Sequence, residues 1–124
     1  MGPAVYTEGE QFQRERRTLF AHAWLLFAAS AQLATAGDFV SHSIGGWPLF
    51  AIRGGDGEAR GFHNVCRHQS MPVVEKAGGS CEMLRCRYHG WTYAPSAKFL
   101  EAPPRVAPAQ PAAKLGLNAV ELIE

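Results

Sequence analysis

The sequence carries almost no net charge, few cysteines and no long apolar run. Its 12 lysines and arginines nearly balance 11 aspartates and glutamates, which leaves a formal net charge of +1. No electrostatic attraction to nucleic acid or to an acidic membrane surface is therefore expected. No stretch of about 18 residues is continuously apolar, so a membrane-spanning helix is not expected either. Neither an internal repeat nor a low-complexity tract is visible.

Three cysteines are few, and their odd number argues against a disulfide framework. Free thiols suit a reducing compartment, and we expect a cytoplasmic protein. Cys81 is interpreted as an ordinary or partly exposed thiol, which leaves two cysteines for chemistry. The length of 124 residues predicts a single domain that buries roughly two-thirds of its unfolded surface.

Each of the two other cysteines stands close to a histidine. Cys66 is followed by His68, and Cys86 by His89, in the pattern C-x-H-x17-C-x2-H. Two thiolates and two imidazoles in this order are the ligands of a mixed-ligand [2Fe–2S] cluster, in which two histidines hold one of the two irons. The pattern predicts Cys66, His68, Cys86 and His89 as the cofactor-binding and metal-binding residues of a one-electron carrier. Gly90 follows the second pair and allows a positive φ or a close approach of the backbone.

A structural zinc site is the main alternative use of these four residues. Zinc also takes sulfur and nitrogen ligands, in a tetrahedral arrangement. Zinc-binding loops usually space their ligands by two to four residues, and the single residue between Cys66 and His68 is atypical. A structural or regulatory module with zinc, or with no metal, stays open at this point.

The residues around both pairs resemble a known family. Residues 62–68 (F-H-N-V-C-R-H) and 86–93 (C-R-Y-H-G-W-T-Y) are similar to the Rieske [2Fe–2S] domain at the N-terminal part of aromatic-ring-hydroxylating (Rieske non-haem iron) oxygenase large (alpha) subunits. Respiratory-chain Rieske proteins carry an additional cysteine in each loop, and a serine where this chain has Trp91. With fewer hydrogen bonds to the cluster sulfurs, a low reduction potential is expected.

The resemblance implies an electron-transfer role in a dioxygenase or monooxygenase. A ferredoxin or reductase would supply single electrons to a Rieske-type [2Fe–2S] cluster. The acceptor would be a mononuclear iron in the oxygenase catalytic domain or a neighbouring subunit, and a homo-oligomer, a trimer by resemblance, is expected. A freestanding Rieske-type ferredoxin is the alternative, but the N-terminal helix and Trp24 favour the oxygenase.

The catalytic iron of that family is held by two histidines and a carboxylate. No histidine follows His89, and His22, His42 and His63 form no closely spaced pair near an aspartate. We therefore expect no catalytic residue and no oxygen-activating site in this chain, and the sequence does not identify a substrate. The three early histidines are interpreted as surface or packing residues.

The N-terminal segment is predicted to be helical. Thr7 followed by Glu10 forms a capping-box pattern, and Phe12, Leu19 and Phe20 can share an apolar face. Arg16 and Arg17 before an apolar run could instead mark an export signal, but His22 and Trp24 interrupt that run.

The remainder of the chain predicts an all-β fold, a Rieske-type antiparallel β-sandwich or barrel with a small cluster-binding subdomain. We expect a helical segment at 1–36 and the Rieske domain at 37–124, with cluster-binding loops at 66–70 and 86–91. Turn signals such as Gly45-Gly46 separate short strands. Those strands are expected at 39–44, 48–53, 59–65, 83–85, 91–93, 98–100 and 117–123, with an extended proline-rich crossing before the last one.

Aromatic and basic residues crowd the two ligand pairs. Trp91, Tyr88 and Tyr93 could form an electron path or an aromatic binding patch. Trp91 is expected to pack in the core beneath the cluster, and Tyr88 to screen the cluster from water. The positive charges are interpreted either as a solvated surface or as a means of steering an acidic electron donor. They belong to Arg67, Arg85 and Arg87.

Overall fold

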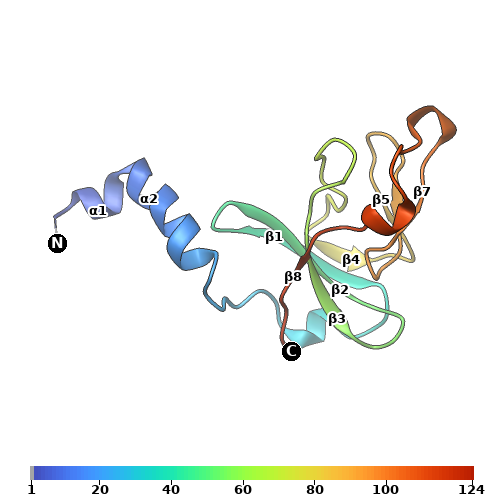
Figure 1. Ribbon diagram of the computed structural model, residues 1–124. Helices are drawn as coiled ribbons and strands as arrows, with labels where there is room; N and C mark the ends of the chain where they lie inside the picture. Colours follow the sequence, from blue (N-terminus) through green and yellow to red (C-terminus); the bar gives the residue numbers. More distant parts are fainter. Residues whose placement is uncertain (1) are drawn as a thin grey trace.

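The computed structural model describes residues 2–124, apart from the side chain of Ala4, and contains two antiparallel sheets (Figure 1). The larger sheet has five strands in the order β4-β1-β2-β3-β8. Its strands are β1 (Asp38–Ile44), β2 (Trp47–Arg53), β3 (Ala59–His63), β4 (Gly78–Ser80) and β8 (Ala119–Val120). The smaller sheet has the order β5-β6-β7, with β5 (Leu84–Arg85), β6 (Thr92–Tyr93) and β7 (Phe99–Glu101). The predicted antiparallel all-β class is confirmed.

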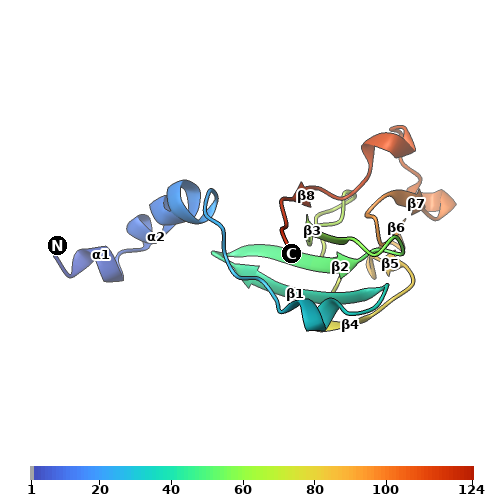
Figure 2. The same cartoon turned by 90° about the horizontal axis from the view of Figure 1, so that it is seen from below.

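The hairpin of β1 and β2 forms the long central pair of the larger sheet (Figure 2). Gly45 and Gly46 have φ angles of +55° and +80°, as a two-residue hairpin turn with the right-handed twist of its strands requires. The register pairs Ile44 with Trp47 directly across this turn. This hairpin was expected from the Gly-Gly pair, and the structure confirms it.

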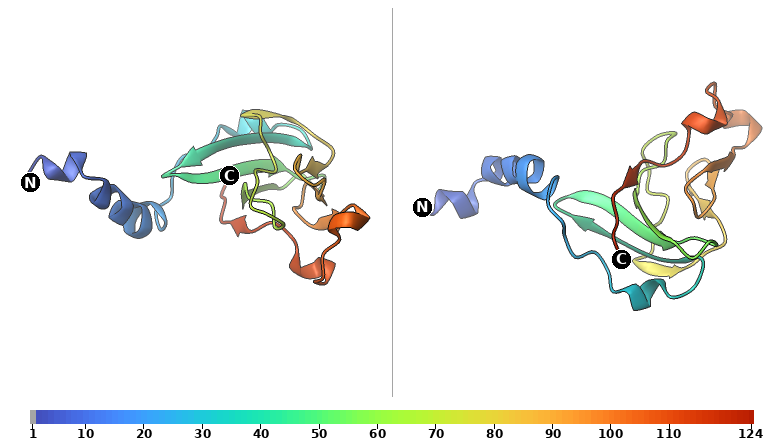
Figure 3. Two further views of the ribbon diagram at one scale, coloured as in Figure 1. Left: turned by 90° about the horizontal axis from the view of Figure 1, so that it is seen from above. Right: turned by 60° about the horizontal axis from the view of Figure 1, so that its bottom comes forward.

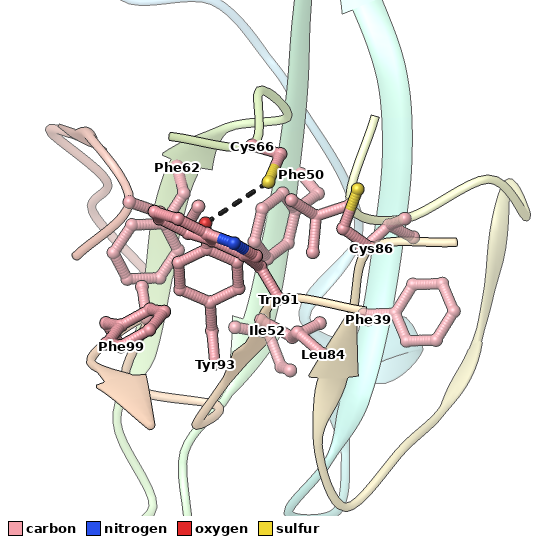
Figure 4. Packing of buried hydrophobic residues seen from close by; sticks show 14 of the residues in the cluster. Phe39, Phe50, Ile52, Phe62, Cys66, Leu84, Cys86, Trp91, Tyr93 and Phe99 are labelled. Atoms are coloured by element: carbon pink, nitrogen blue, oxygen red, sulfur yellow. Dashed lines mark hydrogen bonds between the residues drawn. The ribbon is translucent and has the colours of Figure 1, made fainter. Parts of the chain in front are cut away.

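The hydrophobic core lies between the two sheets (Figure 4). Strands of the larger sheet contribute Phe50, Ile52 and Phe62, and the smaller sheet contributes Tyr93 and Phe99. Cys66 and Cys86 belong to this same buried cluster. The candidate ligands are thus built into the core, and the core packing determines where they lie.

The N-terminal helical segment extends away from the two sheets (Figures 1 and 3). It consists of α1 (Ala4–Thr7), α2 (Gly9–Glu15) and a π-helical turn, η1 (Arg16–Phe20). The predicted capping box is wrong, because Glu8 occupies the N-cap of α2 without a side-chain bond and the Thr7 hydroxyl donates to the Pro3 carbonyl. Phe12 and Leu19 are exposed, so this segment leaves apolar side chains in solvent. Along residues 2–124 no helix has the length and apolar character needed to cross a bilayer.

Other segments differ from the sequence-based expectation at their ends. The last strand is only Ala119–Val120, and β3 ends at His63 rather than continuing to residue 65. The proline-rich crossing contains two short 3-10 turns, η3 (Pro104–Val106) and η4 (Ala112–Lys114). A further 3-10 turn, η2 (Ser30–Leu33), precedes β1. Strand β4 was not predicted, because its Gly-Gly-Ser sequence has low strand propensity.

Candidate metal centre

The two loops that carry the candidate ligands close with the same pattern of backbone hydrogen bonds. In the first, the Cys66 N–H donates to the Met71 carbonyl at 2.8 Å, and the Ser70 N–H donates to the Cys66 carbonyl at 3.0 Å. In the second, the Cys86 N–H donates to the Trp91 carbonyl and the Gly90 N–H to the Cys86 carbonyl, both at 2.9 Å. Each cysteine therefore closes its own loop through the residues four and five positions later.

Each loop has a residue in the left-handed backbone conformation four positions after its cysteine. Ser70 has a φ of 58° and Gly90 a φ of 75°. At Gly90 an added Cβ would lie 3.3 Å from Cγ of Pro103 and 3.4 Å from Nη2 of Arg85. The expected positive φ at Gly90 is confirmed.

A buried asparagine anchors the far side of the first loop. Asn64 follows β3 directly, and its Oδ1 accepts from the backbone N–H groups of Val73 and Val74 at 2.8 and 2.9 Å. Its Nδ2 donates to the Val74 carbonyl at 2.6 Å. These bonds hold the chain that returns from the loop against the strand that leads into it. Sequence reasoning did not identify this role.

The two histidines meet above the loops. The ring centroids of His68 and His89 lie 4.7 Å apart, with an interplanar angle of 70°. The His68 ring stacks on Trp91 at 4.9 Å and 10°, and the Tyr88 ring lies 3.9 Å from that of His89. Trp91 is buried in the core, as expected, whereas Tyr88 stays exposed beside His89.

The donor set fits a [2Fe–2S] cluster. Cys66 and Cys86 are free thiols, exposed by only 2% and 3%. His89 Nδ1 is buried with no hydrogen-bond partner in the described part of the chain, so this nitrogen is available to a metal. Among residues 2–124 no three side chains of histidine, cysteine, aspartate or glutamate converge as on a single metal ion. The four residues form a pair of neighbouring imidazoles and a pair of interacting thiols, which corresponds to the two irons of a mixed-ligand cluster.

Backbone donors surround the second cysteine. Burial raises the pKa of the Cys86 thiol, while a hydrogen bond from the Tyr88 backbone lowers it. The adjacent Cys66 raises this pKa again, because two thiolates repel each other, and the His89 backbone N–H opposes that effect. Two buried thiols that resist sharing negative charge are suited to a cationic iron centre, which stabilises both thiolates.

Sequence reasoning placed Tyr93 in an electron path or an aromatic patch but did not identify its contact with Cys66. Its hydroxyl lies 3.3 Å from Cys66 Sγ and accepts the Arg67 backbone N–H at 3.2 Å (Figure 4). Burial raises the pKa of Tyr93, and the contact with Cys66 raises it further, so the hydroxyl keeps its proton. Strand alternation is the signal that could have found it, because Tyr93 lies two residues beyond Trp91 and faces the same side.

The family model of the Rieske [2Fe-2S] domain matches residues 23–116. The chain belongs to the Rieske [2Fe-2S] domain family. Its cofactor is therefore the Rieske-type [2Fe–2S] cluster, and the resemblance noted in the sequence is confirmed.

Relatives of this Rieske domain are the large subunits of oxygenases. It is 33% identical over 103 residues to the biphenyl 2,3-dioxygenase subunit alpha of Rhodococcus jostii, covering 83% of this chain and 22% of that protein. It is 34% identical over 97 residues to the glycine betaine monooxygenase oxygenase subunit of Chromohalobacter salexigens, covering 78% of this chain and 22% of that protein. This Rieske domain thus spans about a fifth of the length of the curated relatives that it matches.

Solved structures show the same fold. Naphthalene 1,2-dioxygenase with indole bound in its active site superposes with a TM-score of 0.89 at 29% identity, over 97% of this chain and 28% of that one. A quaternary ammonium Rieske monooxygenase shares the fold at a TM-score of 0.86 and 24% identity, over 95% of this chain and 33% of that one. The Rieske domain is thus homologous to part of oxygenase alpha subunits.

The other residues singled out in the sequence lie away from the paired ligands. The His63 ring packs edge-on against Trp47, and His42 binds the Phe27 carbonyl at 2.8 Å. His22 is exposed. Cys81 is half-buried against the core, and burial raises the pKa of its thiol, in line with its interpretation as an ordinary thiol.

Proposed function

We propose that Cys66 and Cys86 hold one iron of the cluster and that His68 and His89 hold the other. The shared loop geometry supports this assignment, since it presents one cysteine and one histidine from each loop. When bound, the cluster accepts and releases one electron at a time. The protein supplies the buried thiols, the orientation of the imidazoles on Trp91 and Tyr88, and the hydrogen bond from Tyr93.

Electrons are exchanged through the histidine side of the centre. The observation that carries this proposal is the difference in exposure within the ligand set. Both cysteines are buried in the core, whereas His68 and His89 are half-buried and reach the surface. Because electron transfer weakens with distance, a redox partner approaches the imidazole edges rather than the thiols.

The proposed role is that of the electron-transfer domain of an aromatic-ring-hydroxylating dioxygenase or monooxygenase alpha subunit. A ferredoxin or reductase supplies the electron, and a mononuclear iron in the catalytic domain or a neighbouring subunit receives it. Similarity to the alpha subunits of dioxygenases supports this role. We assign residues 37–124 to the cluster-binding domain and 1–36 to the N-terminal helical segment that precedes it.

Anaerobic reconstitution of the full chain with iron and sulfide tests the ligand assignment. We expect about two irons and two sulfides per chain, with the visible and electron-spin-resonance spectra of a mixed-ligand cluster. Cys81→Ser should keep these spectra, while His68→Ser and His89→Ser should each abolish the mixed-ligand signature. A chain that binds one zinc ion and no sulfide, or a His89→Ser variant with an unchanged spectrum, contradicts the assignment.

A further inference from the structure

A hollow opens beside His68 and Trp91. Its volume is about 360 Å³. His68 and Trp91 form one part of its lining, and residues 105–110 with Leu115 form the other. The Trp91 indole donates to the Val106 carbonyl at 3.0 Å, which ties the two parts together. The hollow is therefore a preformed part of the fold.

The charge of this hollow is positive and uncompensated. Arg67 and Arg105 line it, and none of its lining residues is an aspartate or glutamate. Arg67 donates to the Asn118 side-chain oxygen at 2.9 Å, and that amide is neutral. Arg105 is exposed and has no hydrogen bond or ion pair with residues 2–124. By contrast, Arg87 on the second ligand loop is paired with Glu75.

We propose that this hollow receives an aspartate or glutamate side chain of the protein that donates the electron. Two guanidinium groups without an acidic partner attract a carboxylate, because each can donate charge-assisted hydrogen bonds to it. Val106, Ala107 and Pro108 form an apolar part of the lining. A carboxylate held there brings the surface of the donor against the His68 ring.

The partner's role as an electron donor rests on the function proposed above. A docked iron–sulfur donor loses one electron, and the cluster of this chain gains it. The arginines hold the donor by charge and leave the covalent structure of both proteins unchanged. Sequence reasoning pointed to Arg67, Arg85 and Arg87. In the structure Arg87 pairs with Glu75, and the arginines that line the hollow are Arg67 and Arg105.

An inert anion tests the docking site directly. Tris(oxalato)chromate(III), a paramagnetic trianion that presents carboxylate oxygens, is titrated into the ¹⁵N-labelled full chain at low ionic strength. We expect the amide signals of Val106, Ala107 and Ala109 to broaden first. Arg105→Gln should remove most of that broadening, whereas Lys98→Gln, which removes an exposed charge outside the lining, should leave it in place. Broadening centred elsewhere, or equal in Arg105→Gln and the unaltered chain, overturns the proposal.

Reduction kinetics test the same site with a protein. The donor is a pre-reduced acidic plant-type [2Fe–2S] ferredoxin, mixed with the reconstituted chain in a stopped-flow instrument. Arg105→Gln should slow the second-order reduction at low salt by roughly threefold to tenfold, and the difference should fade at high salt. Equal slowing by Lys98→Gln would show a general charge effect and overturn the docking site.

The two proposals fail in different ways. If the chain forms no mixed-ligand cluster, the proposed function fails, whatever the chromium probe shows. If the cluster forms and Arg105→Gln changes neither the probe binding nor the reduction rate, only the docking site fails. Visible spectra of the unaltered chain and both variants separate these two results.

Discussion

The hydroxyl of Tyr93 lies 3.3 Å from the sulfur of Cys66, inside the core. Because this oxygen already accepts the Arg67 backbone N–H, its own proton is free to point toward the sulfur. A hydrogen bond to a ligand sulfur stabilises the reduced, more negative form of an iron–sulfur centre. The chain has Trp91 where respiratory-chain Rieske proteins have a serine, but Tyr93 gives the Cys66 sulfur one side-chain hydroxyl as a partner.

Tyr93→Phe should lower the reduction potential. The lost bond corresponds to about 0.5–1.5 kcal/mol, which equals about 20–65 mV for one electron. A redox titration followed by visible spectroscopy measures the shift. Tyr88→Phe is the matched control, because the Tyr88 ring is exposed, and it should leave the potential nearly unchanged. An unaltered potential in Tyr93→Phe would show that the hydroxyl does not donate to the sulfur.

Gly90→Ala should destabilise the second ligand loop. A φ of 75° costs an L-residue about 1–2 kcal/mol, and the added Cβ would press against Pro103. We expect a lower melting temperature and a smaller yield of loaded cluster, measured by thermal unfolding and iron analysis. Gly55→Ala is the control, because nothing lies within 4 Å of its Cβ position and its φ is not positive. If both variants have the same melting temperature, the left-handed conformation at residue 90 does not limit the stability of the loop.

Asn64→Leu should be among the most destabilising substitutions in the chain. It leaves the buried N–H groups of Val73 and Val74 without an acceptor, at a cost of about 1–3 kcal/mol for each. Urea unfolding measures the loss. Asn118→Ala removes an exposed amide with a single side-chain partner and should cost less than about 1 kcal/mol. Similar unfolding midpoints for the two variants would contradict the anchoring role of Asn64.

Acid should weaken the link between the C-terminal residues and β2. Hydrogen bonds from Arg53 hold the pKa of Glu124 below its usual value, and Arg53 also donates to the Leu33 carbonyl. A carboxylate whose pKa is lower in the folded chain stabilises the fold above its unfolded pKa, and this stabilisation is lost as the pH falls through the folded pKa.

Glu124→Gln should therefore lower the melting temperature near neutral pH and have little effect in strong acid. Thermal melts at several pH values check this convergence. Glu121→Gln serves as the control, because Glu121 forms no ion pair with residues 2–124, and its effect should not depend on pH in this way. If the melting temperatures of Glu124→Gln and of the unaltered chain differ by the same amount at every pH, the ionisation of Glu124 is not linked to stability.

Local signals predicted much of the architecture. Gly45-Gly46 defined the central hairpin because a two-residue turn needs left-handed residues, and the structure has the turn there. The capping box at Thr7 and Glu10 failed because Thr7 ends α1 and bonds backward to Pro3. A capping-box pattern is compatible with a helix N-terminus, but the surrounding chain decides whether a helix begins there.

The amino-acid sequence by itself determined the family and the cofactor, and it predicted the two candidate ligand pairs, because each pair spans only a few residues and its chemistry depends on residue type and spacing. Only the tertiary structure decided what surrounds those pairs. Tyr93 reaches Cys66 across 27 positions, and Arg105 comes to line the hollow beside His68 through the fold of the proline-rich segment. Such contacts depend on how the two sheets pack, and no pattern of neighbouring residues encodes the distance between segments that far apart.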